Sequence, residues 1–159
     1  MSRRGRKGFT AGDSRESMGV GRDVLRMLLM DENKTFRDSL AALLAERFPD
    51  LDVRTHSGAW EYRFLLAMVE KLQPGVVLAD MHTLAGKAVS FARDVKARLP
   101  RTVVVILCGS AIPEYRNAAY RGGADLCLLK DEATFEGIAL LVHHLQTRAS
   151  KAPGGSSPE

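Results

Sequence analysis

The sequence predicts an α/β protein with a five-stranded parallel sheet and helices on both faces. Five short apolar segments alternate with five amphipathic ones, and the connections between them have ordinary lengths. The clearest buried strand is 102–107 (TVVVIL), in which β-branched residues dominate. Charged side chains directly follow or end three of the apolar segments, at the sheet edge where open α/β sheets bind ligands.

Each expected strand is a short apolar run bounded by turn residues or by charges. The segment 25–30 comes first and is apolar enough to lie inside the sheet. The segment 51–55 is less apolar, which favours a place nearer the sheet edge. The central strand, 76–80, follows a Pro-Gly pair, and the last two strands are 102–107 and 126–129.

Helices are expected between the strands, because apolar side chains recur there at helical spacing. Ser57 is the expected N-cap of the second helix, and a shorter fourth helix begins near Pro113 and ends at Gly122-Gly123. The expected apolar faces are Phe36, Leu40, Leu43 and Leu44 in 35–47; Trp60, Phe64, Met68 and Leu72 in 59–72; Ala88, Ala92, Val95 and Leu99 in 87–99; and Phe135, Ile138, Leu141, Val142 and Leu145 in 132–147.

With 159 residues, 45% of them hydrophobic, the chain is long enough for one domain with a substantial core. We expect that domain at 23–147, flanked by disordered tails at 1–22 and 148–159. No apolar run approaches a membrane span, and the basic start lacks a secretory-signal core, so a cytoplasmic location is expected. The two cysteines form no disulfide framework and fit that compartment as reduced thiols.

The formal net charge of +4 lies mainly in the first 23 residues, which hold six basic and three acidic side chains. The folded body therefore has no strong electrostatic attraction for nucleic acid. About a dozen polar residues follow the last expected helix, too few for a helix-turn-helix. Neither nucleic acid nor membrane is an expected partner.

Acidic and basic side chains mark three expected strand ends. Asp31 and Glu32 follow the first strand, Asp80 ends the third, and Lys130 follows the fifth. Asp80 alone is best explained as a cap of the next loop or helix. The charged residues Asp31, Glu32 and Lys130 at other strand ends favour a functional site instead.

These residues, in this order, resemble the receiver domains of two-component response regulators. The resemblance runs from Val24 to about Leu145 and includes the segment 123–131 (GADLCLLKD). The Lys-Asp pair at 130–131 and the run 36–40 (FRDSL) are similar to receivers of the NarL/LuxR type.

The resemblance implies a flavodoxin-like, doubly wound sheet of strand order 2-1-3-4-5, with five helices and a site between the first and third strands. That order would place the carboxylates of Asp31, Glu32 and Asp80 side by side, where they repel one another unless a cation intervenes. The implied cation is Mg²⁺, held by these three carboxylates and the backbone carbonyl of His82.

The resemblance also implies the chemistry. Asp80 would accept a phosphoryl group from the phosphohistidine of a sensor histidine kinase, and Lys130 would pair with a phosphoryl oxygen. Such a protein is a phosphoacceptor with at most slow self-dephosphorylation, rather than an enzyme. We expect a single-domain response regulator that signals to an output protein through its fourth and fifth helices and the strand between them, by protein contact; homodimerisation stays open.

Two positions depart from the family. Cys108 stands where the family has Thr or Ser, and Cys127 stands at the position of the switch aromatic. A thiol is a weaker donor than a hydroxyl, and Ser110, two residues on, is an alternative donor. The loop after Asp80 also lacks the usual Met-Pro.

Several hypotheses therefore compete. Phosphotransfer to Asp80 survives with an altered relay, or the chain is a degenerate receiver that binds partners without phosphorylation. An enzyme of the same sheet class is disfavoured, because no Gly-rich phosphate loop is present. A redox switch between Cys108 and Cys127 is a further hypothesis, against which stands the usual inertness of buried cysteines.

Overall fold

The computed structural model describes residues 24–56, 61–83, 87–110, 112–131 and 133–151. The strands are β1 (Arg26–Met30), β2 (Asp52–His56), β3 (Val76–Asp80), β4 (Val103–Cys108) and β5 (Leu126–Leu129). The helices are α2 (Lys34–Arg47), α3 (Tyr62–Leu72), α4 (Ala88–Arg98), α5 (Pro113–Arg121) and α6 (Thr134–Lys151). The strands form one parallel sheet in the order β2-β1-β3-β4-β5, which confirms the predicted fold class and strand order.

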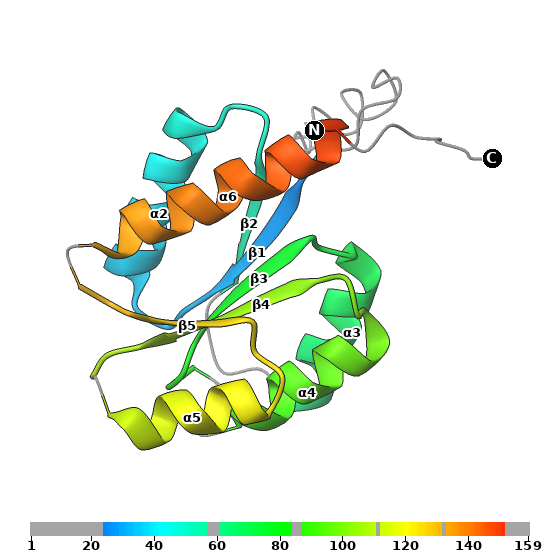
Figure 1. The fold of residues 1–159 in the computed structure, drawn as a ribbon, viewed down its shortest axis with the longest axis vertical. Coiled ribbons are helices and arrows are strands. Elements are labelled where there is room, and N and C mark those ends of the chain that lie inside the picture. Colours follow the sequence, from blue (N-terminus) through cyan, green and yellow to red (C-terminus); the bar gives the residue numbers. More distant parts are fainter. Residues whose placement is uncertain (1–23, 57–60, 84–86, 111, 132, 152–159) are drawn as a thin grey trace, which may run out of the picture.

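Helices cover both faces of this sheet. Figure 1 shows α2 and α6 on one face and α3, α4 and α5 on the other. Two separate apolar clusters lie under them: Phe91 and Leu65 belong to the first, and Leu44 and Ile138 to the second. Strand β3 is buried along its whole length, as a strand covered on both faces must be.

The strand register decides which side chains meet at the carboxyl edge of the sheet. Met30 pairs with Ala79, so the next residues on the two strands, Asp31 and Asp80, emerge side by side. On the other side of β3, Asp80 pairs with Leu107. The fold thus brings the ends of β1, β3 and β4 to one place.

Several element boundaries differ from the predicted ones. Helix α6 continues to Lys151, so residues 148–151 are helical where a disordered tail was expected. Helix α3 begins at Tyr62 rather than 59, because Glu61 has an extended backbone and serves as its N-cap. The predicted cap Ser57 lies outside the described residues. Strands β2 and β4 each begin and end one residue later than predicted.

The buried face of α3 was predicted only in part, since Met68 and Leu72 do pack against the core but Phe64 does not. Phe64 is 51% exposed, whereas Leu65, Leu66 and Val69 are buried. The helix is rotated relative to the predicted face, because it buries its most continuous apolar stripe. In α4 the most buried large side chain is Phe91, at 0% exposure, which was not among the predicted positions.

No helix in the described part of the chain has the length and apolar character needed to span a bilayer.

The contrast between two phenylalanines gives a test of this packing. Replacing Phe91→Ala is expected to lower the free energy of unfolding by about 3–5 kcal/mol, because it leaves a cavity against the Tyr62 ring. Replacing Phe64→Ala, on an exposed side chain of the same type, should change it by less than about 1 kcal/mol. Urea unfolding of both variants measures the difference, and equal losses would contradict the observed orientation of α3.

Candidate functional site

One lysine ammonium joins two carboxylates at the carboxyl edge of the sheet. The Nζ of Lys130 lies 2.8 Å from Oδ2 of Asp31 and 2.9 Å from Oδ1 of Asp80. Asp31 and Asp80 are 1% and 5% exposed, so these contacts are little screened by water. Because two carboxylates share one ammonium, the cluster has an excess negative charge that attracts a further cation.

The loop after β1 holds Asp31 through its backbone and its side chain. The backbone N–H of Asn33 donates to Oδ1 of Asp31 at 2.9 Å. The buried guanidinium of Arg37 donates to the Asp31 carbonyl at 2.7 Å. Asn33 also caps α2, since its Oδ1 accepts from the N–H of Phe36 at 3.0 Å. The helix start and the acidic residue are therefore fixed by one set of contacts.

The turn after β3 holds Asp80 in a similar way. The N–H of His82 donates to Oδ2 of Asp80 at 2.9 Å, and the N–H of Thr83 donates to its carbonyl at 3.1 Å. The N–H of Met81 donates to the Leu107 carbonyl at 2.8 Å, which continues the pairing with β4 past the strand end. This leaves Oδ1 of Asp80 aimed at Lys130.

The lysine itself is placed by three further features. Its backbone N–H donates to the Cys108 carbonyl at 2.8 Å, which joins it to the end of β4. Its Nζ lies 4.2 Å from the centroid of the Phe36 ring, a cation–π contact. Burial disfavours the charged ammonium, but the hydrogen bonds to Asp31 and Asp80 outweigh burial and raise the pKa of Lys130. The side chain is therefore an ammonium at neutral pH.

Glu32 lies differently from the other predicted site residues. Its side chain is exposed, and its backbone N–H donates to Oγ1 of Thr83 at 3.0 Å. Among the described residues, no group of three or more His, Cys, Asp or Glu side chains is arranged to hold a metal ion. The structure thus brings Asp31, Asp80 and Lys130 together but does not bring Glu32 into their cluster.

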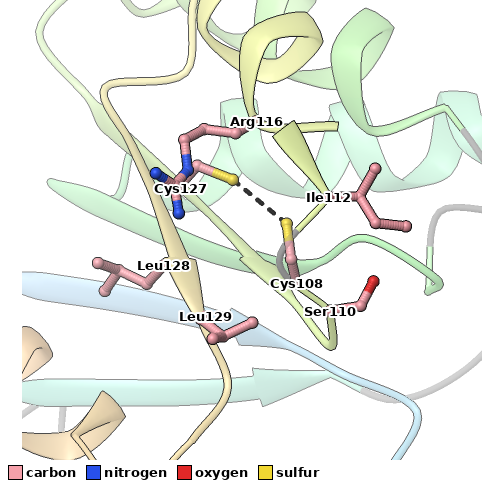
Figure 2. Close-up of a pocket in the computed structure, with 7 residues that line it drawn as sticks. All are labelled: Cys108, Ser110, Ile112, Arg116, Cys127, Leu128 and Leu129. Atoms are coloured by element: carbon pink, nitrogen blue, oxygen red, sulfur yellow. Dashed lines mark hydrogen bonds between the residues drawn. The ribbon is translucent and has the colours of Figure 1, made fainter. Parts of the chain in front are cut away.

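The two cysteines of the chain meet each other next to this cluster. Figure 2 shows the two thiols turned toward one another, with 3.2 Å between the sulfur atoms. Both are buried and both are free. Burial raises the pKa of the Cys108 thiol, and the hydrogen bond with Cys127 and the nearby charge of Asp80 raise it further. Ser110, the alternative donor, is exposed.

Three positioning residues were not identified from the sequence: Phe36, Arg37 and Thr83. Thr83 is 6% exposed and joins the β3 turn to the loop after β1. The contacts of Phe36 and Thr83 join segments distant in sequence, so spacing along the chain carries no signal for them, whereas Arg37 reaches the Asp31 carbonyl six residues away. The only local signal is the run that contains Phe36 and Arg37, directly after the acidic pair.

Comparison with known proteins agrees with this fold. No protein-family model matches the chain. The chain is 26% identical, over 112 residues, to YxjL of Bacillus subtilis (strain 168), an uncharacterized transcriptional regulatory protein. The match covers 70% of this chain and 50% of that protein, so the chain spans about half the length of this curated relative.

Solved receiver structures resemble it closely in three dimensions. A CheY-like response regulator receiver domain from Methanospirillum hungatei JF-1 has a TM-score of 0.67 at 17% identity, covering 82% of this chain and all of that one. A response regulator from Burkholderia pseudomallei, solved with a phosphorylated aspartic acid, a calcium ion and citrate, has a TM-score of 0.62 at 22% identity, covering 81% of this chain and 75% of that one.

The chain therefore has the fold of response-regulator receiver domains, as the sequence resemblance predicted. At these identities the likeness shows the fold alone. The roles of Asp31, Glu32, Asp80 and Lys130 in phosphorylation and metal binding stay predictions.

The shared ammonium predicts a pH-dependent stability difference. Replacing Lys130→Met leaves two buried carboxylates without their cation and is expected to lower the free energy of unfolding by about 1–3 kcal/mol at pH 7. The pKa of Lys130 is raised in the folded state. The contribution of its ammonium to the free energy of unfolding is therefore fully present below the unfolded-state pKa of about 10.4, and it is lost as pH rises through the folded-state pKa.

Urea unfolding at several pH values measures this difference between wild type and variant. It should be constant from about pH 7 to 10 and shrink above that range. The exposed Lys71→Met is the matched control and should show little loss at any of these pH values. A Lys130→Met difference that stays at its full size as pH rises past 11 would contradict the ion-pair assignment.

Proposed function

We propose that the chain is a response-regulator receiver that accepts a phosphoryl group on Asp80 from the phosphohistidine of a sensor histidine kinase. The observation that supports this most is the single Lys130 ammonium held between the buried carboxylates of Asp31 and Asp80. A carboxylate at a strand end can act as a nucleophile, and a fixed cation beside it can stabilise charge on the transferred group.

In this proposal an oxygen of Asp80 attacks phosphorus, and the bond between phosphorus and the histidine nitrogen of the kinase breaks. The transferred group has three oxygens with developing negative charge. Lys130 already lies 2.9 Å from Oδ1 of Asp80, so its ammonium can pair with one of these oxygens by a small movement. The N–H of His82, which donates to the other oxygen of Asp80, keeps the nucleophile oriented.

A divalent cation fits the donors that the site offers. Oxygens of Asp31 and Asp80 contact one nitrogen, so they lie close enough to share one small cation. We propose that Mg²⁺ is held by these two carboxylates and the His82 carbonyl, with waters completing its coordination. When bound, Mg²⁺ would offset the negative charge of the carboxylates and of the phosphoryl oxygens.

The role of Glu32 is separable from that of Asp31. Replacing Asp31→Asn is expected to weaken Mg²⁺ binding at least about tenfold, because it removes a buried carboxylate ligand. Replacing Glu32→Gln should weaken it less, since the Glu32 side chain is exposed and reaches the ion at most through water. Calorimetric titration with Mg²⁺ compares both variants with the exposed Asp50→Asn control, and an unchanged affinity in Asp31→Asn would exclude this site.

The phosphoacceptor is tested directly by mass. Incubation with Mg²⁺ and acetyl phosphate is expected to add about 80 Da to the intact wild-type chain, the mass of one phosphoryl group. Asp80→Asn should show no adduct, because the nucleophile is gone, whereas Asp50→Asn should react as the wild type does. Omission of Mg²⁺ should remove most of the adduct. An adduct of the same size in Asp80→Asn would place the acceptor elsewhere.

A degenerate receiver is the second candidate, and one observation favours it. Cys108 and Cys127, at the positions of the family's hydroxyl and aromatic switch residues, contact each other instead. In that case the fold binds its partner without phosphorylation, and the acetyl phosphate experiment gives no adduct in any variant. Output through protein contact and the possibility of a homodimer belong to both candidates and stay predictions.

A further inference from the structure

The contact between the two cysteines is unusually close for two packed side chains. Their sulfur atoms are 3.2 Å apart, and Cys108 and Cys127 are 6% and 8% exposed. A disulfide bond has a sulfur–sulfur distance of about 2.05 Å, so an approach of little more than about 1 Å separates this contact from a bond. The sequence contains no other cysteine that could compete for either thiol.

The strand register shows how the two thiols meet. Cys127 is paired with Ile106 and Cys108 with Leu129, so the cysteines are diagonal neighbours on adjacent strands. Both belong to the apolar cluster under α3 and α4, which places their side chains on the same face of the sheet. Neighbouring strands lie about 4.8 Å apart and rise about 3.3 Å per residue, so residues offset by two positions on parallel strands have Cα atoms roughly 8 Å apart. Disulfide-bonded residues are usually closer, so a bond would draw the strand ends together.

The end of β4 has room to make that movement. Cys108 is the last residue of β4, and it is followed by Gly109, where an added Cβ would meet no atom within 4 Å. On β5 the backbone N–H of Cys127 donates to the Tyr120 hydroxyl at 3.1 Å, which holds that strand to α5. The movement is therefore expected at Cys108 rather than at Cys127.

We propose that Cys108 and Cys127 are a reversible modification site, at which a hydroperoxide oxidises the two thiols to an intramolecular disulfide. Both cysteines line one small pocket together with Ser110, Ile112 and Arg116, as Figure 2 shows, and hydrogen peroxide would have to reach the thiols from this side. The guanidinium of Arg116 favours a negative charge on the Cys108 sulfur, while burial opposes it and raises the pKa of that thiol.

The chemistry balances with one equivalent of peroxide. One thiol loses its proton, and the thiolate attacks one oxygen of the hydroperoxide, so the oxygen–oxygen bond breaks and the sulfur becomes a sulfenic acid. The leaving oxygen takes up the proton and departs as water from hydrogen peroxide, or as the alcohol from an organic hydroperoxide. The second thiol then attacks the sulfenic sulfur, expels water and closes the disulfide. Two thiols are oxidised and one hydroperoxide is reduced. A dithiol reductant reverses the modification by exchange.

The disulfide would act on the site described above through the backbone. The Cys108 carbonyl accepts the hydrogen bond of the Lys130 N–H at 2.8 Å, so a shift of Cys108 also moves the lysine that joins the two carboxylates. This consequence rests on the proposed function, whereas the disulfide itself does not. Oxidation is expected to change the rate of phosphorylation of Asp80 at least about threefold.

The experiment treats the full chain with hydrogen peroxide, blocks remaining thiols with N-ethylmaleimide after denaturation, and measures the intact mass. The oxidised chain is expected to be about 2 Da lighter and to carry no maleimide, whereas the reduced chain carries two. Dithiothreitol should restore both thiols. Proteolytic mapping should yield one peptide pair joined through residues 108 and 127.

Matched variants separate this modification from general oxidation. Cys108→Ser and Cys127→Ser should each fail to lose 2 Da and should retain a thiol that maleimide blocks after reduction. Two blocked thiols in the oxidised wild type would overturn the proposal. So would overoxidation to sulfinic acid without a joined peptide, or a disulfide formed only between two chains.

The effect on the phosphoacceptor has its own readout. The rate of acetyl phosphate adduct formation is compared in the reduced and the oxidised wild type, with Cys127→Ser compared before and after peroxide as the control. Equal rates in the two redox states would overturn the coupling and leave the disulfide standing. No adduct even in the reduced chain would instead contradict the proposed function, while the mass loss of 2 Da would still decide the disulfide.

Discussion

The ammonium of Lys130 between the carboxylates of Asp31 and Asp80 is the interaction on which the rest of the site depends. Three strand ends must meet for it to form, and the parallel register of the neighbouring strands β1, β3, β4 and β5 brings them together. Two buried carboxylates next to each other repel, so the fold tolerates them only with a cation between them. The same charge imbalance that makes the lysine necessary also attracts a metal ion, which would offset the negative charge that a phosphoryl group adds at Asp80.

The surroundings of this cluster are held by backbone groups more than by other charges. The N–H groups of Asn33 and His82 occupy one oxygen of each carboxylate, and the Phe36 ring lies against the ammonium. Thr83 joins the two acidic loops to each other, and Arg37 joins the first of them to α2. These contacts reduce the freedom of the carboxylates before any ligand binds, which lowers the entropy lost when one does.

Much of the fold was predictable because strong apolar runs leave little choice of structure. Strands β3 and β5 have the predicted bounds, and the other strands differ by one residue. Alternating strands and helices allow few topologies, and the observed order is the expected one. The errors lie where local pattern is ambiguous: α3 is amphipathic enough that Phe64 and Leu65 compete for the core, and only packing against the sheet decides between them.

By itself the sequence determined the parallel sheet and the presence of Asp31, Asp80 and Lys130 at strand ends, because hydrophobic burial requires each apolar run to stop where a charge begins. It did not determine which of two adjacent acids faces the cluster. Only the tertiary structure turned Asp31 inward and Glu32 outward, through the contact of the Glu32 backbone with Thr83. The tertiary structure likewise decided that Cys108 and Cys127 contact each other. The register between neighbouring strands is set by packing across the whole sheet and not by any local pattern.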